Sequence, residues 1–394
     1  MKKTIAYFLI LLIALTTSCS SDKQANDGLA FIDVTKNYPE KEISLTDIAD
    51  VTYLYLNSDD DDYLYSGSIS YITKNTVVVY SRMSGDVLFF SRDGTPKSRF
   101  NRKGQGPEEY VNAFTFIYDE IADDLFVSRM FDIMVYSSKG QFKRKITLPE
   151  GLRVDGRMVS FDERSLFLYN SGNDVIRAES NEAGLSAENY NITPFYLISK
   201  SDGEVLDYVE IPYVPIFLGI YLDGQQIPGF TTRLVKSPEG VLLSSFETDT
   251  IFLYSHDKSL TPILYKTPSV GSTDPKIYLN NCLERGQYQF IEVCTVRAGD
   301  VYPGVFPVTH YTRNKPTGEV VRPKFFLPDY EGKEFIISPR GVGNIYEEGY
   351  YFELDLFELK QAYHDNKLSG KLKELVAILN EDEDNNVFML VEFK

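Results

Sequence analysis

The chain repeats one pattern five times, an apolar strand followed by a polar turn and a second strand. The copies are VLFFSRDGTPKSRF (87–100), IMVYSSKGQFKRKITL (133–148), FYLISKSDGEVLDYVEI (195–211), IFLYSHDKSLTPILY (251–265) and VTHYTRNKPTGEVVRPKFF (308–326). Successive copies are 46, 62, 56 and 57 residues apart, measured between Phe90, Tyr136, Ile198, Tyr254 and Tyr311. Each copy follows another apolar run, at 76–81, 124–129, 165–170, 241–246 and 289–293. Alternating apolar runs joined by glycine-bearing turns indicate β-hairpins, so the chain is predicted to be a serial array of β-units.

Repeats of this length favour one β-architecture. A β-propeller repeats blades of about four strands around an axis, whereas a β-solenoid needs shorter and more regular repeats. A large β-sandwich is the other alternative. Loose repeats of 46–62 residues suit propeller blades with decorated loops. We therefore predict an all-β fold, a six-bladed β-propeller over residues 41–394.

The sixth blade is expected to join the two ends of the chain. Residues 349–359 are strand-like, leucines at helical spacing follow at 368–379, and VFMLVEF (387–393) is a final strand. Near the N-terminus, Val51–Leu56 is a strand with no partner nearby in sequence. A propeller closes its ring by pairing strands from both ends in one blade, which leaves no long open edge. We therefore expect the two terminal strands to share a blade, with a short helix inserted near the C-terminus.

Residues 1–19 have the features of an export signal. Lys2 and Lys3 precede an apolar run of 11 residues, Ile5–Leu15, which is shorter than the roughly 20 residues needed to cross a bilayer. The run leads into LTTSC, where Cys19 follows small residues. This junction resembles the lipobox of bacterial lipoproteins, with Thr16 in the place of the usual leucine. Lipid attachment through Cys19 is predicted, and ordinary cleavage with free secretion is the alternative.

Residues 20–40 are predicted to be a flexible tether, because SSDKQANDGLA (20–30) is small, polar and without apolar period. A lipid anchor and a tether would hold the domain at a membrane surface. The expected location is the cell envelope, at the outer membrane, with both the periplasmic and the surface face left open. The formal net charge of −17 becomes −19 once Lys2 and Lys3 are removed, which argues against nucleic acid as a partner and against lying flat on anionic lipid.

The stretch RFNRKGQGPEEY (99–110) is predicted to be the joint between two blades. Gly104, Gly106 and Pro107 would set the backbone path, and Tyr110 opens the next apolar run. At least one of the two glycines is expected to have a positive φ. Arg102 and Lys103 lie beside these glycines, so an anion-binding site is the alternative reading of the loop.

Cys282 and Cys294 are the cysteines left after Cys19, and they form either a disulfide or two buried thiols. Aspartates 59–62 and the acidic run 381–384 are expected to be solvated turns, since consecutive carboxylates point in different directions and cannot all ligate one calcium ion. Tyr63–Tyr65 is the best candidate for an exposed aromatic platform.

No catalytic motif is found. His256, His310 and His364 are far apart and form no zinc motif, and no serine-hydrolase elbow occurs. A pair of carboxylates for glycoside hydrolysis depends on separation in space, so the sequence cannot select one from 57 acids. No catalytic residue, metal or cofactor is predicted.

Several segments carry a family resemblance: ISLTDIADVTYLYL, VVVYSRMSGDVLFFSRDG, RKGQGPEEY, the pair DLFVSR and IMVYSSKGQF, and the tail EDEDNNVFMLVEFK. Together they resemble the bacterial six-bladed β-propeller lipoproteins, relatives of the NHL-repeat propellers. Glu108 stands where the loop in that family commonly has a third glycine. The resemblance implies six blades and a lipid anchor, and it brings no established reaction.

Two functional classes follow from these features. The favoured one is a non-enzymatic binding or scaffold module, expected to be a monomer, that presents the propeller to a glycan, a peptide or an envelope protein. The alternative is an envelope hydrolase or lyase that works at the mouth of the central channel. Polar groups converging at that mouth would indicate catalysis, whereas a mouth sealed by tyrosine, phenylalanine and backbone would indicate binding.

Overall fold

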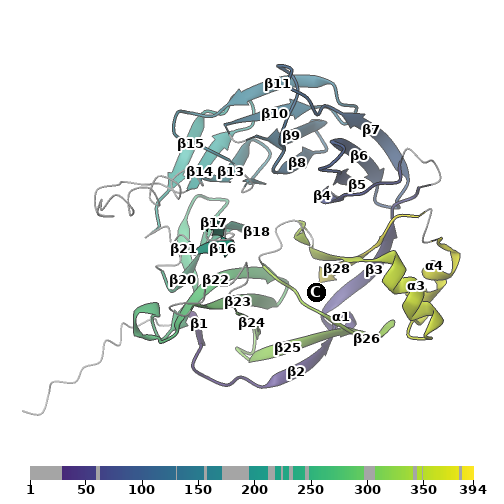
Figure 1. The fold of residues 1–394 in the computed structure, drawn as a ribbon. Helices are drawn as coiled ribbons and strands as arrows, with labels where there is room; N and C mark the ends of the chain where they lie inside the picture. The colour runs from purple at the N-terminus through teal and green to yellow at the C-terminus, as the bar shows by residue number, and fades with distance from the viewer. Residues whose placement is uncertain are drawn as a thin grey trace, which may run out of the picture.

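The computed structural model describes residues 29–394, apart from residues 59–62, 130, 155–157, 171–194, 212–217, 223–224, 230–233, 245–247, 297–306, 340–343, 348 and 381–383. The predicted signal peptide and Cys19 therefore lie outside the described residues. Six sheets follow one another around a ring (Figure 1). This arrangement confirms the predicted six-bladed β-propeller.

Blades 1, 2 and 3 are antiparallel sheets of four strands each. Blade 1 contains β4 (Ser68–Ile72), β5 (Thr76–Tyr80), β6 (Asp86–Ser91) and β7 (Pro96–Asn101). Blade 2 contains β8 (Phe116–Asp119), β9 (Asp124–Ser128), β10 (Asp132–Tyr136) and β11 (Phe142–Thr147). Blade 3 contains β12 (Met158–Ser160), β13 (Ser165–Tyr169), β14 (Phe195–Ser199) and β15 (Val205–Val209). The last two strands of each blade are the first three predicted hairpins.

Blades 4 and 5 are larger, because each also takes one strand from the N-terminal part of the chain, which is described below. Blade 4 contains β18 (Leu234–Ser237), β19 (Gly240–Leu243), β20 (Thr250–Ser255) and β21 (Leu260–Thr267). Blade 5 contains β22 (Lys276–Arg285), β23 (Tyr288–Val296), β24 (Val308–Asn314), β25 (Val320–Leu327) and β26 (Tyr330–Phe335). The 3-10 turn Val270–Ser272 connects the two blades, and a separate hairpin, β16 (Leu218–Leu222) and β17 (Gln225–Gly229), precedes blade 4.

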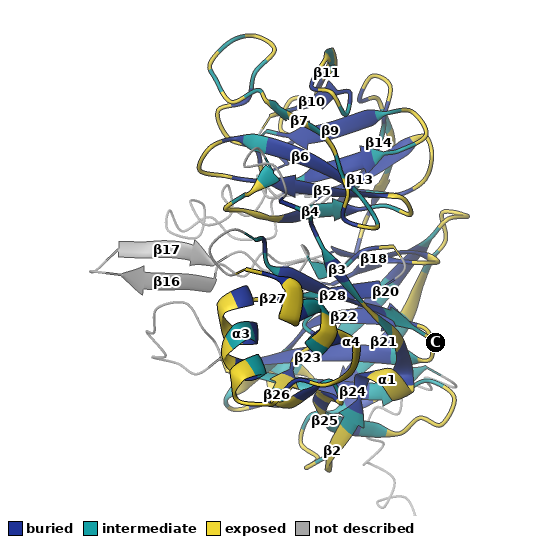
Figure 2. Cartoon of the chain, turned by 90° about the vertical axis from the view of Figure 1, so that its right-hand side faces the viewer, coloured by how far each residue is buried: buried dark blue, intermediate teal, exposed yellow. Residues whose placement is uncertain are grey.

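Burial explains why the strands differ in composition. The second strands of blades 1 to 3, TVVVY, DLFVS and SLFLY, are buried at every position. A strand covered on both faces has a mainly apolar sequence, and the polar residues of these three strands, Thr76, Asp124, Ser128 and Ser165, lie at the strand ends. The outer strands PKSRFN and FKRKIT instead alternate partly buried and exposed positions, with Ile146 fully buried, since one of their faces meets water. Figure 2 shows this gradient, with buried strands inside and exposed residues at the surface.

An N-terminal strap, residues 30–44, runs along the outside of two blades. Its first strand, β1 (Ala30–Asp33), pairs in parallel with β21 of blade 4, and its second, β2 (Glu40–Ser44), pairs in parallel with β25 of blade 5. Ile32 is fully buried in the core between these blades. The predicted tether over residues 20–40 therefore ends too late, because Ala30 already lies in the propeller.

Blade 6 closes the ring with strands from both ends of the chain. The C-terminal strand β28 (Val387–Phe393) lies between β27 (Gly349–Leu354) and β3 (Ala49–Tyr55), and is antiparallel to both. Five consecutive side chains of β28, residues 387–391, are buried. The predicted pairing of the two terminal strands is confirmed.

Two helices, rather than one, join β27 to β28. The predicted helix is α4 (Gly370–Ile378), which buries Leu372 and Val376. A further helix, α3 (Leu356–His364), occupies residues predicted as the end of a strand. Its cap explains the difference: the Glu358 N–H donates to the Asp355 carboxylate at 2.9 Å, which ends the strand and begins a helix. One short helix, α1 (Leu45–Ile48), lies between β2 and β3.

Cys282 and Cys294 are both buried, and no disulfide joins them. They lie on adjacent strands, but Cys282 is paired with Ile291 and Cys294 with Tyr278, so the register keeps them apart. Of the two alternatives left open by the sequence, the structure has the buried thiols.

Candidate functional site

The loop between β7 and β8 carries the glycine-rich stretch singled out in the sequence. Neither Gly104 nor Gly106 has a positive φ, so that prediction is wrong. The glycines permit close approach instead: a Cβ at Gly104 would overlap the Glu109 carboxylate, and one at Gly106 would lie 3.0 Å from Glu109 Oε2. The Gly106 N–H donates to the same oxygen at 2.8 Å. The loop thus folds around the Glu109 side chain.

Tyr110 fixes the end of this loop in the core between blades 1 and 2. Its side chain is fully buried, and its hydroxyl donates to the Gly85 carbonyl at 3.0 Å. Its ring meets Tyr80 and Tyr136 edge to face. Pro107 lies at the exposed tip of the loop.

The two cations of this loop contact backbone carbonyls. Arg102 Nε donates to the Gly140 carbonyl at 2.8 Å, and Lys103 Nζ donates to the carbonyls of Arg82 and Met83 at 3.2 and 2.6 Å. An anion bound here would share both side chains with these carbonyls. The anion site at Arg102 and Lys103 stays a prediction.

The acidic runs offer little as candidate sites. Residues 59–62 lie outside the described residues, and Asp384 is the described member of 381–384. The Asp384 carboxylate accepts hydrogen bonds from the Tyr55 hydroxyl and from Ser58 Oγ, the latter at 2.9 Å. It therefore ties the end of β3 to the segment before β28.

Tyr63 and Tyr65 do not form an exposed platform, because both rings pack against Phe90 in blade 1. Among the histidines, His310 lies with its Nε2 3.3 Å from a carboxylate oxygen of the buried Glu292. Within the described ranges, no group of three or more His, Cys, Asp or Glu side chains is arranged to hold a metal ion.

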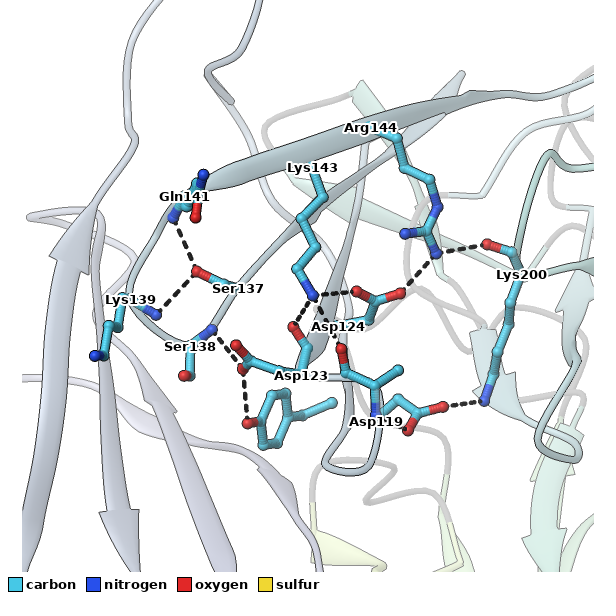
Figure 3. Close-up of polar contacts among 12 residues, drawn as sticks. Asp119, Asp123, Asp124, Ser137, Ser138, Lys139, Gln141, Lys143, Arg144 and Lys200 are labelled. Atoms are coloured by element: carbon cyan, nitrogen blue, oxygen red, sulfur yellow. Dashed lines mark hydrogen bonds and ion pairs between the residues drawn. The ribbon is translucent and has the colours of Figure 1, made fainter.

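A polar groove lies between blades 2 and 3 and encloses about 450 Å³ (Figure 3). Asp124 accepts from Lys143 Nζ and from Arg144 Nη2, each at 2.7 Å. Burial disfavours the ionised form of Asp124, but these two hydrogen bonds outweigh it and hold the pKa of this carboxyl below its usual value. Lys200, across the groove, pairs with Asp119 at 3.1 Å.

Four charged residues of the groove, Asp119, Asp124, Arg144 and Lys200, are joined by ion pairs and a hydrogen bond. Arg144 Nη2 also donates to the Lys200 carbonyl at 2.9 Å, which joins blade 2 to blade 3. Both cations lie over the Phe126 ring, at 5.6 Å for Arg144 and 5.9 Å for Lys200. Because each of these charges already has a protein partner, we interpret the groove as a structural connection between blades.

The central cavity is the stronger candidate. It encloses about 290 Å³, close to the lower limit for small-molecule sites. Five segments line it, four of them in or directly before the first strands of blades 1 to 4 and the fifth just before β27: residues 68–72, 114–116, 158–160, 234–236 and 345–347. Its wall combines aromatic and aliphatic side chains with the hydroxyls of Ser68, Ser70, Thr115 and Ser160.

Lys236 and Glu347 are the charged residues among the described lining of this cavity. Lys236 Nζ lies 3.2 Å from Glu347 Oε1, and the lysine side chain is 19% exposed while that of the glutamate is 69% exposed. Burial lowers the pKa of Lys236, and Glu347 opposes that change. The lysine is thus held inside the cavity, and the carboxylate reaches it from outside.

Arg285, at the end of β22, supports the wall beside this pair. Its guanidinium is buried and donates to the carbonyls of Lys236, Glu284 and Tyr346 at 2.8 to 3.0 Å. Burial lowers the pKa of Arg285 to about 10, so the group stays charged at neutral pH.

Sequence reasoning placed a site at the channel mouth but did not select Lys236, Arg285 or Glu347. The available signal was weak: a lysine inside the apolar run LVKS, and an arginine ending the unusually polar strand NNCLER. Two arrangements of the mouth are expected from the sequence: converging polar groups, for catalysis, or a mouth sealed by aromatic side chains and backbone, for binding. The cavity has neither arrangement, since it combines one ion pair with a wall of aromatic, aliphatic and hydroxyl groups.

Comparison with known proteins agrees with this fold. Residues 20–199 match a family described as "6-bladed beta-propeller". A crystal structure of a Bacteroides fragilis protein named as exported shares 14% identity, with a TM-score of 0.58 over 90% of this chain and 99% of that one. A Bacteroides vulgatus structure, named as a member of the duf4221 family, has 13% identity and a TM-score of 0.46 over 88% of this chain and 97% of that one.

At 14% identity the first likeness establishes the fold and nothing about a ligand. No curated protein matches the chain. None of the helices in the described part of the chain combines the length and apolar character needed to cross a bilayer.

Proposed function

Because the chain is a six-bladed β-propeller, we propose that it is a binding module of the cell envelope, attached by lipid at Cys19, that takes the end of a glycan into its central cavity. The observation that carries the proposal is the composition of the cavity wall. The aromatic residues of the lining include the exposed Phe114 and the buried Phe116 and Tyr346, and four residues with hydroxyl side chains lie among them. Sugars offer both an apolar ring face and hydroxyl groups, so this wall complements them.

The proposal assigns binding rather than catalysis. Lys236 and Glu347 contact each other directly, so the acid and the base of the described lining are already paired. General acid–base chemistry needs the two groups within reach of a substrate and free to exchange a proton with it. An envelope hydrolase or lyase working in the same channel remains the alternative, and it predicts a chemical change in the ligand.

The cavity is tested with Ser160→Phe, which places a ring in its opening. Wild type and variant, as full chains purified from membranes, are screened by thermal shift and calorimetry against mono- and oligosaccharides and against peptides of similar size. Saccharide binding by wild type that Ser160→Phe abolishes would support the proposal, and binding of peptides alone would contradict it. Mass spectrometry of each ligand after incubation detects products, and products would establish the alternative.

The attachment is tested separately. The LTTSC junction predicts that wild type incorporates an alkyne-labelled fatty acid and fractionates with membranes, and that Cys19→Ala does neither. The similar Bacteroides fragilis protein is named as exported, which supports a location outside the cytoplasm. A wild-type protein whose mature N-terminus is unmodified by mass spectrometry would overturn the anchor and leave the cavity unaffected.

A further inference from the structure

We propose that Glu347 occupies the place of a ligand carboxylate on Lys236, so that the central cavity selects ligands with a carboxylate group, of which an acidic sugar is the expected case. This inference rests on the binding function proposed above and names its ligand class. The two members of the ion pair differ in exposure. Lys236 is fixed in the wall and largely enclosed, whereas Glu347 is mostly exposed at the turn before β27.

An exposed partner of this kind is easy to replace. Ion pairs with a solvent-exposed member contribute little, because the side chain must be held in place and water competes for it. A glutamate that swings outward regains full hydration. Lys236 cannot follow it, and would be left with a charge in a mostly enclosed cavity, which is costly. A carboxylate brought by a ligand removes that cost.

Arg285, behind the cavity wall, is positively charged like Lys236. Arg285 makes its three hydrogen bonds to carbonyls, two of them belonging to the lining residues Lys236 and Tyr346. Its Nε has no hydrogen-bond partner within the described part of the chain. Lys236 in the lining and Arg285 behind it are therefore balanced by the carboxylates of Glu347 and Glu284. When Glu347 turns away from Lys236, two cations and one carboxylate remain, which favours a ligand anion even though the whole chain has a net charge of −17.

The remaining lining defines the rest of the ligand. It offers hydroxyls at Ser68, Ser70 and Ser160 beside apolar residues such as Val159 and Ile345. A ligand that suits this wall has a carboxylate on a ring with one apolar face and several hydroxyls. A uronic acid has these groups. A plain organic acid shares the carboxylate and lacks the hydroxyls, so the two sources can be separated by experiment.

The test measures the Kd of glucuronate, glucose and benzoate by calorimetry on the full chain. For wild type we expect glucuronate to bind more tightly than glucose. Lys236→Gln should weaken glucuronate about 10- to 100-fold, the range of hydrogen bonds to charged groups, and leave glucose unchanged. Glu347→Gln should tighten glucuronate about fivefold, which is the ~1 kcal/mol ceiling of an exposed ion pair converted at 1.4 kcal/mol per factor of ten.

A second pair of residues supplies the matched control. Lys41 and Glu319 form an exposed ion pair of 3.0 Å on the rim of blade 5. Lys41→Gln and Glu319→Gln change the net charge of the protein as the cavity variants do, and both should leave all three Kd values unchanged. Equal effects from the rim variants would mean that net charge alone governs binding, which overturns the inference.

The outcomes separate the inference from the function on which it rests. If glucuronate and glucose bind equally and Lys236→Gln changes neither, the selection of a carboxylate is wrong while the glycan module stands. If Glu347→Gln weakens glucuronate, the glutamate supports the site and is not a competitor, so the inference is wrong. If benzoate binds with dependence on Lys236 and no sugar does, the carboxylate site stands and the glycan function fails.

Discussion

Replacing Phe388 with alanine tests whether the ring is one cooperative unit. Phe388, the second residue of β28, is fully buried among side chains of β3, β27 and blade 1, and its ring meets Tyr351 edge to face at 5.9 Å. Strands on both sides prevent the site from collapsing, so the cost should lie within the usual range for a buried phenylalanine, about 3–5 kcal/mol. Denaturation by guanidinium, followed by circular dichroism, measures this loss.

Hydrogen exchange then tells local damage from opening of the ring. Leu125 and Val127 of β9 lie in blade 2, two blades from the substitution. If closure by β28 holds every blade in place, the free energy of opening at these amides falls by the same amount as the global stability. Phe357→Ala on α3 is the control: its side chain is 68% exposed, and it should cost less than about 0.5 kcal/mol. Unchanged exchange in β9 alongside a destabilised β28 would refute the reasoning.

Three further predictions concern the loop and groove between blades. Gly104→Ala should cost about 1 kcal/mol in chemical denaturation, because the Glu109 side chain must move, and a neutral result would mean that this contact is dispensable. Replacing Arg102 and Lys103 together with alanine should leave thermal shifts by sulfate or phosphate unchanged; a wild-type shift that the double variant loses would establish the anion site. Asp124→Asn should lower the melting temperature at pH 7, where the carboxylate is ionised in both states, and the difference should shrink below about pH 4, where the folded form loses its advantage from the lowered pKa. A difference that is constant between pH 7 and 3 would contradict this account.

The blades could be predicted because they repeat. The five hairpins recur with their turns, and a strand buried on both faces shows itself as an uninterrupted apolar run such as TVVVY. The closing blade could be predicted because two terminal strands had no neighbours in sequence. A repeated hairpin is a local pattern, and a terminal strand without a neighbouring partner is equally visible, so both signals can be read from a single sequence.

The errors have a common cause in contacts that only the fold creates. Ala30–Asp33 is a four-residue segment directly after a polar run, too short to indicate a strand, and it becomes one because β21 offers an open edge. Gly104 and Gly106 appeared to need a positive φ, but the reason for glycine is a side chain that folds back from Glu109. The signal that was readable and missed is the pair Asp355 and Glu358, a helix cap within the sequence itself.

The cavity residues could not be chosen from the sequence, because they come from five separate places. Lys236 and Glu347 are 111 residues apart, and Arg285 lies between them in sequence, in a different blade from either. No spacing rule connects these positions. What brings them together is the ring itself, which turns the first strand of each blade toward one axis.

The N-terminal strap also decides how a membrane would pull on this protein. A lipid at Cys19 would be followed by nine residues before Leu29, so its reach to the rim of blade 4 is at most ~35 Å. A pulling force on the tether would act first on β1, where it would be spread over the hydrogen bonds of the parallel pair β1–β21. The next pair to bear the force would be β2–β25 on blade 5. Such a tether would hold the propeller at the rim of blade 4. With the attachment at the rim and the cavity at the axis, neither mouth of the channel has to face the bilayer.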